Sequence, residues 1–194
     1  MDELTMGSQE IDGNFRAVQA VLKAAHFAAQ KHAGQRRKGA AEEPYINHLL
    51  EVAELVASAL AEPDTNLIIA ALLHDTVEDA EVTKEELVER FGGDVADLVM
   101  EVTDDKSLPK AERKRLQIVH ASQISGRAQV IKLADKISNL RSILASPPAD
   151  WSVERKRDYF NWAKQVVNGL SAPNPMLKAE FERLYRQAGS LASS

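Results

Sequence analysis

Apolar residues recur at three- and four-residue spacing along most of the chain, which is the spacing that places them on one face of an α-helix. The clearest case is the segment 127–144, whose apolar stripe comprises Val130, Leu133, Ile137, Leu140 and Leu144. Similar spacing or helix-end signals predict further helices over 15–32, 48–60, 67–79, 83–91, from 94 onward, and over 109–123, 153–168 and 175–187. No segment alternates apolar and polar residues as strands do, so the sequence predicts an all-α fold.

Several helix ends carry characteristic start and stop residues. Thr83-Lys84-Glu85-Glu86 is a capping box, and Gly92-Gly93 ends the short helix that it opens. Pro109 suits the first turn of the following basic helix, and Ser146-Pro147-Pro148 stops the segment 127–144.

The chain is expected to form one domain. The loops at 34–44 and 103–106 are not domain linkers, because apolar helical segments resume within a few residues of each. We therefore expect a single domain over 14–188, with a polar N-terminal extension at 1–13 and a C-terminal tail at 189–194.

Charge and composition exclude several classes of protein. The net charge of −5 argues against a nucleic-acid partner, which would require a basic surface. The chain has no cysteine, and therefore no disulfide and no thiolate metal site. Its first residues lack the features of a signal peptide, and no apolar run approaches the ~20 residues of a membrane span. These properties predict a cytoplasmic enzyme or binding protein, and they leave the oligomeric state open.

The segment His74-Asp75-Thr76-Val77-Glu78-Asp79 carries the most chemistry. It follows the apolar run 67–73 and packs one imidazole and three carboxylates into six positions. On a continuous helix, His74 and Glu78 would share a side, as would Asp75 and Asp79. Clustered anionic groups at the end of a buried helix need a cationic partner, and a divalent metal fits. A buried His–Asp pair that joins neighbouring helices is the alternative.

Two other positions could complete such a metal site. His48 begins an apolar helix after a polar loop, where its side chain can project into a cleft. Asp135, Asn139 and Ser142 form a polar stripe beside the apolar stripe of 127–144. A solvated helix face would explain this stripe equally well, although Lys and Glu are the better helix formers there. The remaining histidines have no acidic residue at ligand spacing and are expected to be structural or solvent-facing: His26, His32 and His120.

His48, the doublet His74-Asp75 and the distant Asp135 resemble the H…HD…D signature of the HD-domain metal-dependent phosphohydrolases. The resemblance extends over about residues 15–187 and is most specific to the small alarmone hydrolases, stand-alone relatives of the hydrolase half of RelA/SpoT-type enzymes. The segments that carry it are Arg36-Arg37-Lys38, Pro44-Tyr45-Ile46-Asn47-His48, the segment 71–79, Glu101-Val102-Thr103-Asp104-Asp105-Lys106 and Lys132-Leu133-Ala134-Asp135-Lys136. It implies an HD-domain helical bundle with His48, His74, Asp75 and Asp135 as metal ligands.

The resemblance also implies a reaction. Small alarmone hydrolases remove the 3′-pyrophosphate of guanosine tetra- or pentaphosphate (ppGpp or pppGpp) with Mn²⁺, giving GDP or GTP plus pyrophosphate. Mixed imidazole and carboxylate ligands suit that metal. Glu78 and Asp79, one turn beyond the doublet, would orient or deprotonate the attacking water.

The substrate of such an enzyme carries two pyrophosphates and needs cationic partners. Guanidinium groups match phosphate geometry, which makes the run Arg36-Arg37-Lys38 the first candidate. By the resemblance, Arg37 and Lys38 contact the phosphates and nucleotide, Tyr45 shapes the pocket, and Asn139 and Ser142 face the nucleoside.

The chain departs from the family pattern at two positions. Leu49 follows His48 where the family usually has proline, and Ser138 stands where relatives often carry an aromatic residue or histidine, which predicts a more open pocket near Asn139. No synthetase domain is expected in a chain of 194 residues. Two alternatives remain: a phosphohydrolase for another 2′- or 3′-phosphorylated nucleotide, and a nucleotide-binding regulator without catalysis. Retention of all the metal positions argues against the regulator.

Overall fold

The computed structural model describes residues 3–188, and their side chains from residue 12 onward. Its helices are α1 (Glu3–Lys31), α2 (Ile46–Ala59), α3 (Thr65–Leu73), α4 (Thr76–Asp79), α5 (Lys84–Phe91), α6 (Gly93–Val102), α7 (Lys110–His120), α8 (Gly126–Ala145), α9 (Val153–Gly169) and α10 (Pro175–Arg186). Within 3–188 no strand forms, and the only β-type pairing is an isolated bridge between Arg36 and Pro44, so the all-α prediction is confirmed. None of these helices has both the length and the hydropathy that a membrane crossing requires.

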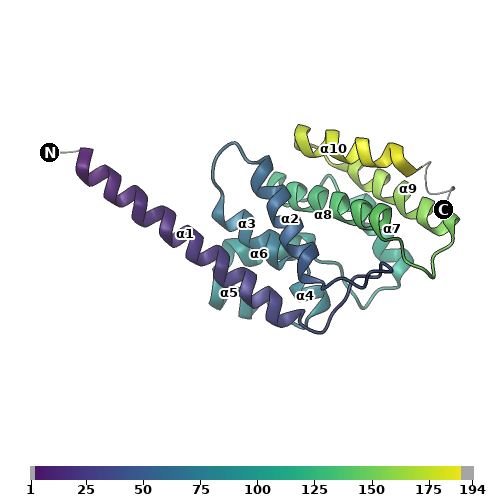
Figure 1. Ribbon diagram of the computed structural model, residues 1–194, viewed down its shortest axis with the longest axis horizontal. Coiled ribbons are helices and arrows are strands. Elements are labelled where there is room, and N and C mark those ends of the chain that lie inside the picture. Colours follow the sequence, from purple (N-terminus) through teal and green to yellow (C-terminus); the bar gives the residue numbers. More distant parts are fainter. Residues whose placement is uncertain (1–2, 189–194) are drawn as a thin grey trace.

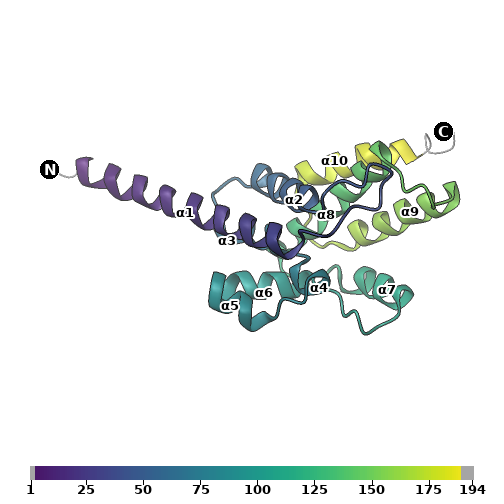
Figure 2. The same cartoon turned by 60° about the horizontal axis from the view of Figure 1, so that its bottom comes forward.

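Helix α8 lies in the middle of the molecule, where it packs against α2, α3, α6, α9 and α10 (Figure 1). In the view of Figure 2, α4 to α7 lie on one side of the molecule and α1, α2, α8, α9 and α10 on the other. The predicted stripe explains this position, because Leu133, Ile137 and Leu140 are fully buried. Lys136 and Ser138 of the same helix are also buried, so α8 brings polar groups into the core.

Helix α1 is longer than predicted, since it begins at Glu3 rather than at Phe15. Its C-terminal half packs against α3 and buries Ala24, Phe27 and Ala28. The N-terminal half projects from the body of the molecule (Figure 1), and Phe15 there is 60% exposed.

The continuous helix predicted over 67–79 is wrong, because the chain breaks between Leu73 and Thr76. The Thr76 hydroxyl donates to the Leu73 carbonyl (2.6 Å), and His74 Nδ1 donates to the Ala71 carbonyl (2.8 Å). These two side chains take carbonyls that a continuing helix would use for its own N–H groups. Asp75 sits at the break with φ −101° and ψ 0°.

The loop between α1 and α2 is held against the end of α8. Arg37 N–H donates to the Glu43 carbonyl (2.8 Å), and the backbone N–H of Ala41 donates to Ser146 Oγ (2.9 Å). A Cβ added at Gly39 would lie 2.3 Å from the Ser146 carbonyl oxygen, so only glycine permits this approach. The loop thereby holds Arg37 and Lys38 beside α8.

The predicted helix-end signals between α5 and α6 are confirmed. The Thr83 hydroxyl accepts a hydrogen bond from Glu86 N–H (3.2 Å) at the start of α5. Gly92 adopts a φ of 90° where α5 ends and α6 begins, a conformation that favours glycine.

Candidate active site

A cavity of about 870 Å³ lies between the loop 32–45, the α3–α4 break, α7, α8 and α9. Every residue that the sequence analysis placed in the site lines it: Arg37, Lys38, Tyr45, His48, His74, Asp75, Glu78, Asp79, Asp135, Asn139 and Ser142. The fold therefore joins segments that are far apart in the sequence around one space.

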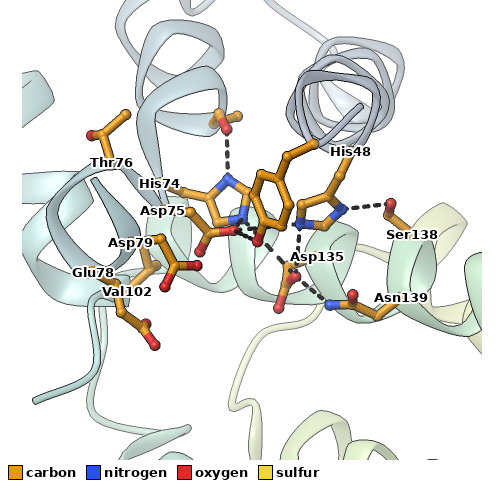
Figure 3. A network of polar contacts seen from close by, with 12 residues as sticks. His48, His74, Asp75, Thr76, Glu78, Asp79, Val102, Asp135, Ser138 and Asn139 are labelled. Carbon is orange, nitrogen blue, oxygen red and sulfur yellow. Dashed lines mark hydrogen bonds and ion pairs between the residues drawn. The ribbon is translucent and has the colours of Figure 1, made fainter. Parts of the chain in front are cut away.

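Four of these side chains converge at one end of the cavity (Figure 3). His48, His74 and Asp135 each place one ligand atom within 4.8 Å of the others. His48 Nε2 lies 3.4 Å from Asp135 Oδ1, and Asp75 Oδ2 lies 3.2 Å from His74 Nε2 and 3.6 Å from His48 Nε2. Two imidazoles and two carboxylates from α2, the α3–α4 break and α8 thus face a common point.

The state of His74 fits a bound cation. Its Nδ1 must donate to the Ala71 carbonyl, because a carbonyl oxygen only accepts. In the neutral ring Nε2 then carries the lone pair, and this buried atom has no hydrogen-bond partner. A buried nitrogen acceptor beside carboxylates is a ligand set for a divalent transition metal.

The carboxylates of this cluster are strongly ionised. Burial alone would raise the pKa of Asp135, but the charges and hydrogen bonds of Lys136 and His48 outweigh this effect. The pKa of Asp135 therefore lies well below the usual value. Burial also opposes protonation of His74, yet Asp75 and Asp135 raise its pKa to about 9. The same negative charge that favours a proton on His74 would favour a metal ion.

Glu78 and Asp79 of α4 lie in different surroundings. Burial, followed by the charges of Asp104, Asp75 and Asp79, raises the pKa of Glu78 to about 7. Glu78 Oε1 accepts from Arg113 Nη1 at 3.0 Å, and Asp79 forms an ion pair with Lys106. Glu78 is therefore a carboxyl that can change protonation state near neutral pH.

Three of the predicted substrate residues, Arg37, Tyr45 and Asn139, form hydrogen bonds that reach the imidazole–carboxylate cluster. Arg37 Nη2 donates to Asn139 Oδ1 (2.9 Å), whose amide nitrogen donates to Asp135 Oδ1 (2.6 Å). The Tyr45 hydroxyl donates to Asp75 Oδ2 at 2.6 Å. Arg36 also lines the cavity, but its guanidinium donates to the backbone carbonyls of Ala33 and Gln35.

Sequence reasoning missed a second group of cations, which line the cavity from α7 and α9. Lys110 and Lys114 of α7 and Arg155 of α9 line the cavity beside Trp151 and Tyr159. Burial, and then neighbouring cations, lower the pKa of both lysines, although the nearby Asp158 carboxylate acts in the opposite direction on Lys114. Their i, i+4 spacing on α7 was the available signal, but a basic helix face is usually solvated.

His32 is structural, as predicted, but it supports the site. Its ring is buried and stacks on Tyr45 with 5.1 Å between centroids. Its Nδ1 lies 2.7 Å from Gln35 Oε1, and Gln35 donates to the Asp79 carbonyl. His26 and His120 are exposed.

The family model of the HD domain matches residues 24–159 of this chain. The chain belongs to the HD-domain family. The match spans His48, His74-Asp75 and Asp135, which form the cluster in the cavity.

Curated HD-domain relatives match nearly the whole domain. The chain is 48% identical over 169 residues to the guanosine-3′,5′-bis(diphosphate) 3′-pyrophosphohydrolase MESH1 of Xenopus tropicalis, covering 87% of this chain and 94% of that protein. It is also 48% identical to the human protein of the same name, with the same two coverages. Chloroplastic RSH2 of Arabidopsis thaliana, a probable GTP diphosphokinase, is 34% identical over 67% of this chain but only 19% of its own length.

Two solved structures share the HD-domain fold. One, from work on a metazoan orthologue of SpoT that hydrolyses ppGpp, has a TM-score of 0.84 at 45% identity and covers 88% of this chain and 96% of that chain. The other is lmo0812 of Listeria monocytogenes, with a TM-score of 0.62 at 31% identity, covering 74% and 99%. The resemblance to the small alarmone hydrolases is confirmed.

Proposed function

We propose that this protein hydrolyses the 3′-pyrophosphate of ppGpp and pppGpp to GDP or GTP plus pyrophosphate, in the cytoplasm. The MESH1 relatives named for the tetraphosphate reaction support this substrate class. The observation that carries the proposal is the cavity itself, which has an anionic imidazole–carboxylate cluster at one end and cations along its other walls.

His48, His74, Asp75 and Asp135 would hold the metal, and Mn²⁺ suits their mixed nitrogen and oxygen donors. When bound, the cation supplies Lewis-acid chemistry, polarising a phosphoryl oxygen and lowering the pKa of a water molecule. Tyr45 and Asn139 orient the two carboxylates, because they donate to Asp75 and Asp135 respectively.

Glu78 and Asp79 orient the attacking water and accept its proton. The water oxygen bonds to the phosphorus that carries the nucleoside 3′-oxygen, the bond from this phosphorus to the 3′-oxygen breaks, and pyrophosphate leaves. Glu78 accepts the proton of the water, and a pKa of about 7 suits a base that works near neutral pH. The departing 3′-oxygen takes up a proton to become the hydroxyl of GDP or GTP.

The cations divide between the two pyrophosphates. Arg37 and Lys38, on the loop beside the metal cluster, bind the 3′-pyrophosphate, and Asn139 and Ser142 face the nucleoside. Lys110, Lys114 and Arg155, which line the cavity from α7 and α9, bind the 5′-phosphates.

The direct test uses purified protein that is stripped with a chelator and reloaded with Mn²⁺, Mg²⁺ or Zn²⁺. The Mn²⁺-loaded protein should release pyrophosphate and GDP from ppGpp, whereas the stripped protein should not. Asp75→Ala and Asp135→Ala should abolish turnover. Asp97→Ala, an exposed position on α6 paired with Lys84, is the matched control and should retain it. No turnover by folded, metal-loaded wild-type protein would refute this function.

The same cluster could serve a phosphohydrolase for another 2′- or 3′-phosphorylated nucleotide, so the assay includes such nucleotides. Faster release of orthophosphate from one of them would favour that alternative. Metal binding without turnover of any nucleotide would favour a binding protein without catalysis.

A further inference from the structure

A chain of polar side chains runs behind His48 and joins α2 to α8. His48 is hydrogen-bonded to Ser138 (Figure 3), with 2.8 Å between Nδ1 and Oγ, and Ser138 Oγ lies 2.5 Å from Glu51 Oε2. His48 is 3% exposed and Ser138 is 1% exposed, so water does not compete for the bond between them. Neither Glu51 nor Ser138 carried a role in the sequence analysis.

The partners fix the direction of each bond. A carboxylate only accepts, so Ser138 must use its single proton toward Glu51. The serine oxygen is then an acceptor for His48, which must carry a proton on Nδ1. In the neutral ring this leaves the lone pair of His48 on Nε2, the atom that faces Asp75 and Asp135.

Glu51 is itself held in place. Its other oxygen accepts from Arg141 Nη1 at 2.9 Å, and Arg141 Nη2 donates to Glu180 of α10 at 2.7 Å. The bond to Arg141 fixes the rotamer of Glu51. Glu51 therefore keeps the hydroxyl proton of Ser138 directed toward itself, which leaves the serine oxygen free to accept from His48.

The two imidazoles of the cluster are therefore oriented by different means. His74 donates to the backbone carbonyl of Ala71, which no side-chain substitution removes. His48 depends on the side chains of Ser138 and Glu51. A substitution at either position can release His48 without touching a metal ligand.

We propose that Ser138 and Glu51 are positioning residues, which hold His48 in the tautomer and orientation that present Nε2 to the metal. This inference rests on the metal site of the proposed function. Partners of this kind typically contribute 10–100-fold to metal affinity in proteins.

The test titrates chelator-treated protein with Mn²⁺ and follows free Mn²⁺ by its EPR signal. Ser138→Ala should weaken binding about 10–100-fold. Ser138→Thr keeps the hydroxyl and should remain close to wild type. Glu51→Gln should also weaken Mn²⁺ binding. Its control is Glu54→Gln, at an exposed position on α2, which should leave the affinity unchanged.

Two further readouts separate positioning from a purely structural role. If the side chains act in series, Glu51→Gln should weaken Mn²⁺ binding in the wild type but add little in the Ser138→Ala background. In zinc-loaded protein, NMR should show a downfield Nδ1–H proton of His48 in the wild type and in Ser138→Thr. That signal should move upfield in Ser138→Ala.

The outcomes distinguish this inference from the function on which it rests. If the wild type binds no metal, the proposed function fails. If the wild type binds Mn²⁺ and Ser138→Ala binds it equally tightly, with only its melting temperature lowered, the positioning role is overturned. If Ser138→Ala does not fold, the Nδ1–H signal of the wild type and the Mn²⁺ titration of Glu51→Gln still test the positioning role. An absent signal together with unchanged affinity would overturn it.

Discussion

At the scale of single residues, the carboxylates of the cavity are set apart by what surrounds them. Lys136 and His48 outweigh the effect of burial and keep Asp135 ionised, whereas burial and then neighbouring carboxylates raise the pKa of Glu78 to about 7. In the proposed mechanism this difference separates the metal ligand Asp135 from the base Glu78, although both residues line one cavity.

Replacing Glu78 should therefore affect the chemical step. Glu78→Gln keeps the size of the side chain and its contact with Arg113 but cannot accept a proton. We expect kcat to fall about 10²–10⁴-fold, with Mn²⁺ affinity unchanged. Glu89→Gln, exposed on α5, should behave as wild type. A Glu78→Gln enzyme with wild-type kcat would remove this residue from the mechanism.

The pH profile should report the same group. A base works when ionised, so kcat/KM should rise with pH through about 7, the pKa of Glu78. Asp104→Asn removes a negative charge that raises this pKa, so the ascending limb should move to lower pH. A limb that moves upward or stays in place would contradict the assignment.

The sequence predicted the residues of the site better than their surroundings. The metal candidates and the substrate residues of the loop 34–44 have characteristic types and spacing, and the fold brings them to one cavity. Lys110, Lys114 and Arg155 were missed, because the i, i+4 spacing of the two lysines also fits a solvated helix face and α7 and α9 meet only in the fold. Ser138 stood out only as a departure from the family, and its bonds to His48 and Glu51 required the structure.

At the scale of elements, the break between α3 and α4 gives the site its shape. The apolar run 67–73 predicts helix α3 correctly. The residue at which the helix ends, however, depends on which groups donate hydrogen bonds to its last backbone carbonyls. The Thr76 hydroxyl donates to the carbonyl of Leu73, and the His74 ring donates to the carbonyl of Ala71. Periodicity contains no information on this competition, so a continuous helix was predicted.

Thr76 should therefore stabilise the break. Thr76→Val preserves volume at a fully buried position but leaves the Leu73 carbonyl without the hydroxyl proton. We expect a loss of about 1–3 kcal/mol in the free energy of unfolding, measured in urea. Thr65→Val, in the first turn of α3, should cost less. Equal stability of Thr76→Val and wild type would show that the hydroxyl bond does not matter.

At the scale of the whole molecule, the catalytic body and the projecting start of α1 are separate in space (Figure 1). Among the side chains that the structure describes, those lining the cavity begin at Gln35, and the first buried one in α1 is Ala24. The expected limits of the domain, residues 14–188, leave out the first turns of this helix.

Removal of residues 1–13 should leave kcat/KM and Mn²⁺ affinity unchanged, because the described residues that line the cavity begin at Gln35. Removal of residues 1–31 should prevent folding, since it deletes Ala24, Phe27 and Ala28 from the core. Circular dichroism and the pyrophosphate assay on both truncations check these outcomes. Loss of activity in the shorter truncation would assign the first turns of α1 a role in the active protein.

The most direct measurement is the fate of oxygen during turnover of ppGpp by the Mn²⁺-loaded protein in ¹⁸O-labelled water. The proposed mechanism predicts one pyrophosphate for each GDP, with the label in the pyrophosphate, because water attacks phosphorus and the bond to the 3′-oxygen breaks. Asp135→Ala should give neither product. Release of orthophosphate, label in the nucleoside hydroxyl, or no turnover by the loaded wild-type protein would contradict the account.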